Sequence, residues 1–379
     1  MEWVIKPLGE LVTFERGLTY SKSDEAEFSS NGVLRSNNVD LETNSLNLDE
    51  IKYLKADFVI PSSKKVVRNS LLMCMSNGSK SHLGKVALIE DDLGYAFGGF
   101  MGLLKPIDTV VLPRYLYYSL ISPAYKKHIQ SLSDGANINN LKYKDLSVFP
   151  VMLPTSLSEQ QRIVDILDAE FAKIDALKEN AEKNLQNAKD LFQAVLRKEL
   201  EPKEGCDVTT LKELLKLTSG DNLTAKSIIT GDYPVYGGNG IMGYHNRYNL
   251  DGLNVLVGRV GALCGNVRLI EGKIWFTDNC FLVHDKTGVF HLPYLAYALQ
   301  NANLRQYATQ AAQPVVSNAS MKDVQLSIPP TVKEQCKIVY MLDKIKENSE
   351  VLQHNYDKTI ILCNDLKQAM LRKAFNGEL

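Results

Sequence analysis

The sequence has few features of secreted, membrane or zinc-binding proteins. Its six cysteines are scattered over 379 residues and none forms a C-x-x-C pair, so neither a disulfide framework nor a zinc knuckle is expected. No apolar run approaches the roughly eighteen residues of a membrane span. The start, MEWVIKPLGE, has no basic segment leading into an apolar one. These absences predict a cytoplasmic protein with reduced thiols.

Catalytic and cofactor-binding motifs are also missing. Gly78 and the Gly84-Lys85 pair are one residue too far apart for a phosphate-binding loop, and valine follows them. There is no G-x-G-x-x-G turn between a strand and a helix, and no Asn-Pro-Pro-Tyr-like tetrapeptide of the kind that holds a flipped base. The six histidines have no metal-ligand spacing. We predict that the chain is not an enzyme and binds no cofactor or metal itself; a nuclease site built from distant Asp, Glu and Lys residues stays an open alternative.

The charge of the chain is nearly balanced, with 43 basic and 44 acidic residues. The pI near 6.6 argues against a protein that coats nucleic acid by charge alone, but it does not exclude a reader of particular bases. The length and the 45% apolar content suffice for two or three packed domains.

The sequence contains an internal repeat. In its clearest part, the second copy follows the first at an offset of 175 residues. LPTSLSEQQRIVDILD at 153–168 returns as IPPTVKEQCKIVYMLD at 328–343, and QAVLRK at 193–198 returns as QAMLRK at 368–373. Neither copy has an insertion between these two landmarks. A loop would tolerate insertions, whereas a long helix that packs along its length does not. Each copy is therefore predicted to form one long helix.

Both predicted helices start and continue in the same way. Ser156-x-x-Glu159 and Thr331-x-x-Glu334 are predicted capping boxes, each with proline before it. Apolar residues then recur at alternating steps of four and three, which is typical of a coiled coil. The alternative is two ordinary amphipathic helices in separate domains. The predicted packing residues of these spacer helices are Ile163, Leu167, Ile174, Leu177 and Leu191 in the first copy and Ile338, Leu342, Ile345, Leu352 and Leu366 in the second.

The segments before the helices correspond more loosely. LGELVTFERG at 8–17 matches LKELLKLTSG at 211–220, and GKVALIE at 84–90 matches GNVRLIE at 265–271. Their offsets drift, and short β-rich runs are punctuated by Gly and Asn. Segments that must keep a fixed geometry stay constant in sequence, whereas segments that must recognise a binding partner diverge. The predicted domains are therefore two variable ones and two spacer helices, at 1–152, 153–206, 207–327 and 328–379.

Together these motifs resemble the DNA-specificity subunit of Type I restriction–modification systems, over essentially the whole chain. The most specific pieces are L/I-P-x-x-x-x-E-Q-x-x-I-V at the start of each helix, the carboxy-terminal LRKAFNGEL, and YPVYGGNGIMGY at 233–244. The resemblance implies an α+β fold: two mixed α/β target-recognition domains joined by two long antiparallel coiled-coil helices, with a pseudo-twofold internal repeat.

The resemblance also implies a function and partners. Each recognition domain would read half of a bipartite double-stranded DNA site, and the chain would direct adenine methylation and ATP-dependent restriction by partner subunits. Those partners would be two methyltransferase subunits and the restriction/translocase subunits, which would carry S-adenosylmethionine, ATP and Mg. A helix of about 44 residues is about 66 Å long, so the unread gap would be at most about 20 base pairs. Because the two domains have diverged, the site should not be palindromic.

The predicted recognition domains are close to neutral. Residues 1–150 hold 17 basic and 17 acidic residues, and residues 207–327 hold ten and nine. A domain that grips DNA alone is usually more basic. The count therefore predicts that partner subunits supply much of the phosphate contact, and that the isolated chain binds DNA weakly and salt-sensitively.

Candidate base contacts are polar residues in probable loops, because Arg and Lys read guanine while Asn and Gln read adenine. The alternative is that the Gly- and Asn-rich segments are simply tight turns, or that Arg35 forms a salt bridge at a strand edge. The candidates are Arg35, Asn37, Asn38, Ser76, Asn77, Lys80 and His82 in the first domain and Asn239, Tyr244, His245, Arg259 and Asn279 in the second.

Partner docking is predicted for the outer faces of the helices, although a charged outer face is often just solvated. Since the two helices are nearly identical, a pseudo-twofold scaffold should bind two copies of one partner. Alternative functions are a specificity subunit of a Type IIB-like or phage-defence system, a free-standing repressor, a DNA-mimicking inhibitor, and a non-catalytic coiled-coil adaptor. An inhibitor of that kind should be strongly acidic, which this chain is not.

Overall fold

The computed structural model describes residues 2–134, 140–309 and 312–379. The chain divides into two compact units: the first comprises Met1–Ala181 with Lys358–Leu379, and the second comprises Glu182–Asp357. Two long helices, α4 (Leu157–Leu200) and α8 (Val332–Ala374), contribute one part to each unit.

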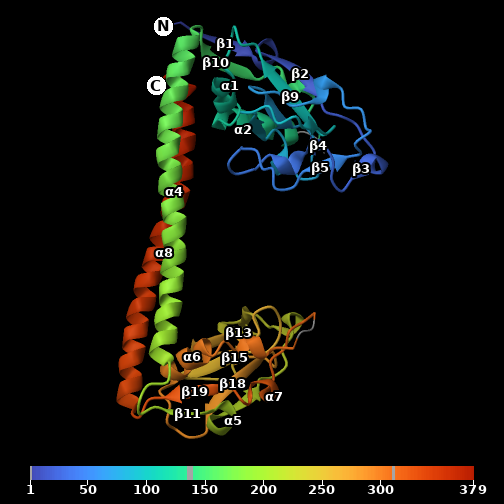
Figure 1. Ribbon diagram of the computed structural model, residues 1–379. Helices are drawn as coiled ribbons and strands as arrows, with labels where there is room; N and C mark the ends of the chain where they lie inside the picture. The colour runs from blue at the N-terminus through green and yellow to red at the C-terminus, as the bar shows by residue number, and fades with distance from the viewer. Residues whose placement is uncertain (1, 135–139, 310–311) are drawn as a thin grey trace. The chain divides into compact units, whose positions relative to one another are not determined.

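The first unit contains two four-stranded sheets and a two-stranded ribbon (Figure 1). The strand orders are β2-β9-β6-β7, β3-β5-β4-β8 and β1-β10. The strands are β1 (Trp3–Pro7), β2 (Val12–Arg16), β3 (Glu25–Ala26), β4 (Asn31–Leu34), β5 (Lys52–Leu54), β6 (Leu71–Cys74), β7 (Val86–Leu88), β8 (Ala96–Phe97), β9 (Met101–Pro106) and β10 (Pro150–Pro154). The helices are α1 (Pro113–Ser119), α2 (Pro123–Asp134) and α3 (Tyr143–Leu146).

The second unit repeats this plan, with sheets in the order β12-β18-β15-β16 and β14-β13-β17 and the ribbon β11-β19. Its strands are β11 (Asp207–Thr210), β12 (Leu215–Ser219), β13 (Tyr233–Gly237), β14 (Gly240–His245), β15 (Asn254–Gly258), β16 (Val267–Ile270), β17 (Trp275–Phe276), β18 (Cys280–Asp285) and β19 (Gln325–Ile328). Its helices are α5 (Leu211–Leu214), α6 (Leu292–Asn301) and α7 (Asn318–Met321). The four-stranded sheet and the ribbon correspond strand for strand in the two units, and the second sheet differs by one additional strand, β3, in the first unit. This agreement confirms the duplication predicted from the sequence.

The long helices run antiparallel. In the first unit, Leu167 near the start of α4 shares a core with Leu371 near the end of α8. In the second unit, Leu196 near the end of α4 shares a core with Leu342 near the start of α8. Each of these cores also includes the adjacent sheet. The predicted α+β fold with two antiparallel spacer helices is therefore confirmed.

A buried glutamine connects each mixed α/β domain to its long helix. Gln160 donates from Nε2 to the carbonyl oxygens of Val110 and Pro154, both at 3.0 Å. Its counterpart in the second unit, Gln335, donates to the carbonyl of Val289 at 2.9 Å. Both glutamines are at most 1% exposed. These are the glutamines of the repeated E-Q motif, which therefore has a structural function.

Helix capping agrees with the prediction in one copy more closely than in the other. The Thr331 hydroxyl accepts a hydrogen bond from the backbone N–H of Glu334 at 3.2 Å, as predicted. In the first copy, Glu159 instead pairs with Arg162 one turn along, at 2.6 Å.

The prediction of the helix packing residues was half right. Ile163, Leu167, Ile174 and Leu342 are buried, and Ile338 and Ile345 are partly buried. By contrast, the four other predicted leucines are exposed, at 53% for Leu177, 52% for Leu191, 40% for Leu352 and 50% for Leu366.

The reason is a one-residue shift of the packed stripe. Between Leu167 and Ile174, the alternating steps of four and three lead to Glu170. The buried residue is instead Phe171, one residue later, which packs edge-on against Tyr118 with ring centroids 5.4 Å apart. Phe192, one residue after Leu191, packs against Tyr297 in the second unit. Two neighbouring stripes satisfy a period of 3.5, and at these two positions of α4 the larger aromatic side chain occupies the packed one.

Candidate functional site

The ends of several strands in the first unit surround a hollow of about 790 Å³. It lies where β2, β4 and β6 end and where β9 begins. We call it the strand-end hollow. Four predicted DNA-contact residues line it together, which the sequence did not guarantee: Arg35, Asn37, Ser76 and Asn77.

Close backbone approaches build this hollow. The backbone N–H groups of Met75 and Ser76 both donate to the carbonyl of Phe100, at 2.9 and 3.1 Å. A Cβ atom at Gly17 would lie 1.9 Å from the carbonyl oxygen of Gly98, so only glycine fits where β2 ends. Strand ends far apart in the sequence are thereby held against one another.

The hollow combines cations with one neutralised acid. Arg16 and Arg35 both line it, and so does Glu25, whose carboxylate is paired with Lys52 at 2.7 Å. The Nε of Arg35 is buried and has no hydrogen-bond partner within the described part of the chain. Burial raises the pKa of the nearby Tyr20 phenol, although the charge of Arg35 opposes the shift. The hollow therefore offers donors and positive charge.

The sequence analysis missed several lining residues, among them Arg16 and Phe100. Arg16 is exposed at the end of β2, and the Phe100 side chain is 71% exposed at the start of β9. The aligned copies carry a signal for the first of them, since Arg16 before Gly17 stands opposite Ser219 before Gly220. The two domains therefore differ in side chain and charge at this matched strand end, and a comparison of the two copies would have identified Arg16.

Asn38 is not available for DNA contact, and its prediction was wrong. The side chain is 1% exposed and its Nδ2 donates to the carbonyls of Asn47 and Glu50, both at 2.9 Å. Its Oδ1 accepts from the backbone N–H of Arg35 at 2.8 Å. The bond to Arg35 closes the turn after β4, and the bonds to Asn47 and Glu50 tie that turn to a later segment. Asn38 therefore shapes the turn that presents Arg35 and Asn37.

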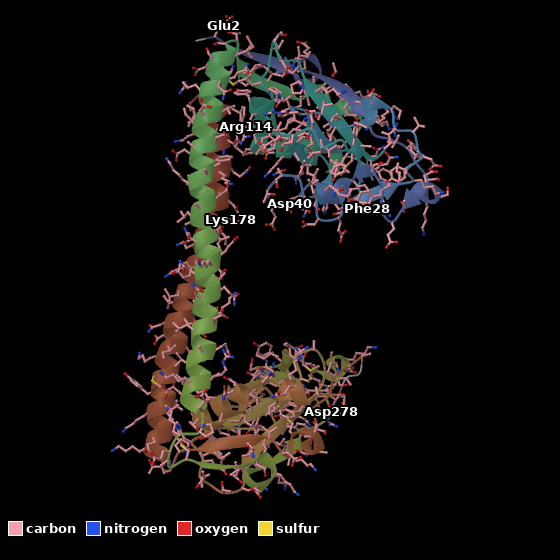
Figure 2. The ribbon with its side chains drawn as sticks, in the orientation of Figure 1. Glu2, Phe28, Asp40, Arg114, Lys178 and Asp278 are labelled. Carbon is pink, nitrogen blue, oxygen red and sulfur yellow. The ribbon has the colours of Figure 1, made fainter. Side chains whose placement is uncertain are left out.

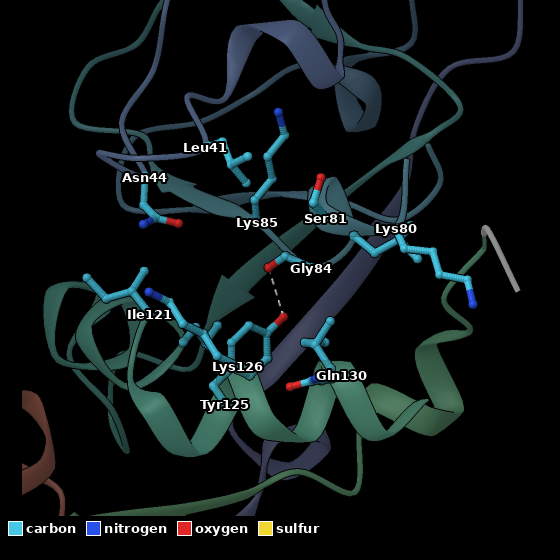
Figure 3. Close-up of a pocket in the computed structure, with 13 residues that line it drawn as sticks. Leu41, Asn44, Lys80, Ser81, Gly84, Lys85, Ile121, Tyr125, Lys126 and Gln130 are labelled. Atoms are coloured by element: carbon cyan, nitrogen blue, oxygen red, sulfur yellow. Dashed lines mark hydrogen bonds between the residues drawn. The ribbon is translucent and has the colours of Figure 1, made fainter. Parts of the chain in front are cut away.

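Lys80 lies at a separate cavity of about 460 Å³ beside α2 (Figure 3), and His82 lies next to Lys85, which also lines that cavity. Lys80 lines it together with Lys85 and Lys126. The Nζ of Lys85 donates to the carbonyl of Val39 at 2.6 Å and lies 2.9 Å from His82 Nδ1. Burial, followed by the charge of Lys85, lowers the pKa of His82. His82 is therefore a neutral acceptor within the loop and not a free DNA contact.

In the second unit, the corresponding strand ends bring together Asn239, Arg259 and Asn279. The backbone N–H of Arg259 donates to the carbonyl of Asn279 at 2.8 Å. The Asn239 Oδ1 accepts from the backbone N–H of Leu263 at 3.2 Å. A Cβ atom at Gly238 would lie 2.3 Å from the Val260 carbonyl oxygen, so this turn needs glycine for packing.

The Arg259 side chain is held loosely at this site. Its guanidinium carbon lies 5.3 Å from the centre of the Phe281 ring. The Nη1 contacts to Ser219 Oγ and the Asp278 carbonyl are long, at 3.4 and 3.5 Å. Its Nε is buried without a partner among the described residues. Asp278 lies in this unit on the side away from α4 and α8 (Figure 2).

His245 and Tyr244 are not part of this group. His245 is 4% exposed, bonds through Nδ1 to the backbone N–H of Ile229 at 3.0 Å, and packs edge-on against Trp275. Its prediction as a DNA contact was therefore wrong. Tyr244 is 52% exposed on the edge strand β14, where it faces Pro234 in the ladder.

Comparisons with known proteins show to which family this chain belongs. The model of the Type I restriction modification DNA specificity domain matches residues 1–187 and 203–358. The chain belongs to this family.

Curated relatives cover the whole chain. It is 27% identical to the Type I restriction enzyme StySPI specificity subunit of Salmonella potsdam and 25% identical to the EcoKI specificity subunit of Escherichia coli K12. Both alignments span 100% of this chain and 89% of the relative. The chain is thus a Type I restriction–modification specificity subunit with two target-recognition domains.

Solved structures share the fold. A chain from a study of complex assembly and conformational transition of the type I R-M system matches with a TM-score of 0.81 at 18% identity, over 100% of this chain and 98% of that one. The HsdS subunit from Thermoanaerobacter tengcongensis matches with a TM-score of 0.60 at 17% identity, over 100% and 97%.

Two further searches of the described residues concern other kinds of site. Within residues 2–134, 140–309 and 312–379, no group of three or more His, Cys, Asp or Glu side chains is arranged to hold a metal ion. Over the same residues, no helix of this specificity subunit has the length and apolar character to cross a membrane.

Proposed function

We propose that this specificity subunit reads an asymmetric bipartite DNA site, with residues 1–152 reading one half and residues 207–327 reading the other. One observation carries the proposal: both domains hold the same strand ends together, yet they place different side chains there. Arg16 and Met75 in the first domain correspond to Ser219 and Arg259 in the second, through equivalent hydrogen bonds and strand registers. One scaffold with two sets of donors suits two different half-sites.

The chain would be non-catalytic and would direct chemistry on partner subunits. Two methyltransferase subunits would methylate adenine with S-adenosylmethionine, and restriction/translocase subunits would use ATP and Mg to move and cleave DNA. The spacer helices at 153–206 and 328–379 would set the unread gap, at most about 20 base pairs for helices about 66 Å long. A DNA-recognition function of this kind would place the protein in the cytoplasm.

The exposed leucines support docking of two copies of one partner. Leu177 and Leu352 are 175 residues apart, as are Leu191 and Leu366, so all four follow the repeat. Leu177 and Leu366 belong to the first unit, whereas Leu191 and Leu352 belong to the second. Each unit therefore offers one pair of exposed leucines that belong to the repeat, which would suit one methyltransferase subunit per pair.

The experiment is to express the chain together with its cognate methyltransferase and to map modified adenines by long-read sequencing. A two-part, asymmetric motif that is methylated on both strands, and is absent without this chain, is the expected result. Exchanging residues 1–152 for those of a relative should then change one half only. If the complex forms and the methyltransferase is active but no new motif is methylated, the proposal fails and a coiled-coil adaptor becomes the better hypothesis. Cleavage by a fused nuclease–methyltransferase would instead assign the chain to a Type IIB-like or phage-defence system.

A further inference from the structure

We propose that Arg35 and Arg259 are the guanine-reading residues of the first and second domains, and that each half-site contains a guanine that one of them contacts. The inference rests on the proposed function and adds to it the residues that determine specificity and the base that they select.

The two arginines reach equivalent sites from different strands. The carbonyl of Leu34 accepts from the N–H of Gly98 at 2.9 Å, and the carbonyl of Tyr236 accepts from the N–H of Thr277 at 3.0 Å. These matched bonds place Arg35, just after β4, in register with Gly237, the last residue of β13.

A second matched bond places the other arginine. Met75 donates its N–H to the Phe100 carbonyl, as Arg259 donates to the Asn279 carbonyl. Arg259 therefore stands where the first domain has methionine, just after β15. Each domain has one arginine at one of these two positions and a residue without charge at the other.

Unsatisfied donors mark both arginines. Within the described part of the chain, five buried side-chain polar atoms have no hydrogen-bond partner, and the Nε atoms of Arg35 and Arg259 are two of them. Buried donors are almost always paired in folded proteins, so an unpaired one needs an explanation. A ligand with hydrogen-bond acceptor atoms, bound at these strand ends, would supply that explanation. The Nε and one Nη of a guanidinium donate together as a planar fork.

The chemistry of the fork selects guanine. In the major groove, guanine presents two acceptors side by side, O6 and N7, and a bidentate arginine is their commonest partner. Adenine presents one acceptor and one donor there, so it cannot satisfy two donors. The hollow of about 790 Å³ beside Arg35 is lined in part by Phe100 and Arg16, both of which are exposed to solvent. A base edge that enters this hollow would meet the side chain of Arg35, which lines it.

The experiment uses the whole complex with its methyltransferase and compares single variants. Arg35→Lys keeps the charge and removes the fork, and Arg35→Ala removes both; Arg259→Lys and Arg259→Ala do the same in the second domain. Arg68→Ala and Arg247→Ala are matched controls, because both arginines are exposed outside the site. Long-read sequencing reads the methylated motif, and initial rates on a duplex with the wild-type motif measure the loss.

The Arg35 variants should lower the methylation rate about 5- to 150-fold and relax the requirement for guanine at one position in one half-site only. The Arg259 variants should have the same effects in the other half-site. The controls should leave the motif unchanged. Replacing the selected guanine by 7-deazaguanine removes N7 without disturbing base pairing. It should weaken binding by the wild-type complex and have little further effect on the lysine variant.

The outcomes separate the inference from the proposed function. If the wild-type complex methylates no bipartite motif, the proposed function fails. If it does, but a half-site lacks guanine or the lysine variants keep full discrimination, the guanine-reading inference is overturned. If an arginine variant does not assemble, the 7-deazaguanine measurement on the wild-type complex still decides, because an unchanged affinity contradicts the inference.

Discussion

The side-chain Oε1 of Gln160, on α4, accepts a hydrogen bond from the backbone N–H of Leu112 at 2.9 Å. Gln335, on α8, makes the same bond with the N–H of His291 at 2.8 Å. Leu112 and His291 directly precede α1 and α6, so each glutamine ties the start of a domain helix to a spacer helix. This buried amide therefore adds a directional contact to the apolar core that each domain shares with the long helices.

We predict that Gln160→Ala destabilises the chain by about 2–4 kcal/mol, because it leaves the N–H of Leu112 and two carbonyls buried without partners. Gln161→Ala is the matched control: Gln161 is exposed and bonds only along the helix to Asp165, so its effect should stay within about 0.5 kcal/mol. Denaturant unfolding of the purified chain measures both. Equal stability of the two variants would contradict the function assigned to Gln160.

The exposed leucines should matter for assembly and not for folding. Leu177→Gln with Leu366→Gln, both in the first unit, should reduce the bound methyltransferase from two copies to one while the unfolding free energy changes by less than about 1 kcal/mol. The second-unit pair, Leu191→Gln with Leu352→Gln, should behave alike. Native mass spectrometry of the complex counts the copies.

Leu167→Ala is the contrasting variant for that test. Leu167 is fully buried, so its truncation should cost about 2–5 kcal/mol of stability. Two bound copies in both leucine-to-glutamine double variants would show that the docking surface lies elsewhere.

Acidification should weaken the first domain through His82. Burial and the neighbouring charge of Lys85 lower its pKa in the folded chain below the ordinary value of 6.5. The unfolded chain therefore binds the proton more readily, and stability present above about pH 6.5 falls as the pH drops towards the folded pKa. His82→Asn should flatten the loss of unfolding free energy between about pH 7 and pH 5. A variant with the same pH profile as the wild type would rule out this contribution.

Helix length should set the unread gap of the DNA site. Inserting one heptad into α4 and one at the matching point of α8 preserves the packed stripe and lengthens the pair by about 10 Å. The methylated motif should then gain about three unread base pairs, with both half-sites unchanged. An unchanged gap in the sequenced motif would disprove the ruler.

The sequence by itself determined the architecture. The repeat at an offset of 175 and the identical E-Q start of each helix were sufficient to predict two long helices and two diverged domains. A helix that must pack along its length tolerates no insertion, so its register stays readable in one dimension. The sequence did not show which stripe of each helix is packed. Leu191 and Phe192 both fit a 3.5-residue period, and only the contact with Tyr297 favours the phenylalanine.

Only the tertiary structure decided which polar residues can face a ligand. Arg35 and Asn38 are three residues apart in one loop, yet Asn38 is buried because the carbonyls of Asn47 and Glu50 come close enough to accept its amide. His245 is buried in the same way, against Trp275. Whether a polar side chain is satisfied inside the protein depends on partners that are distant in sequence, and only the folded chain brings those partners into contact.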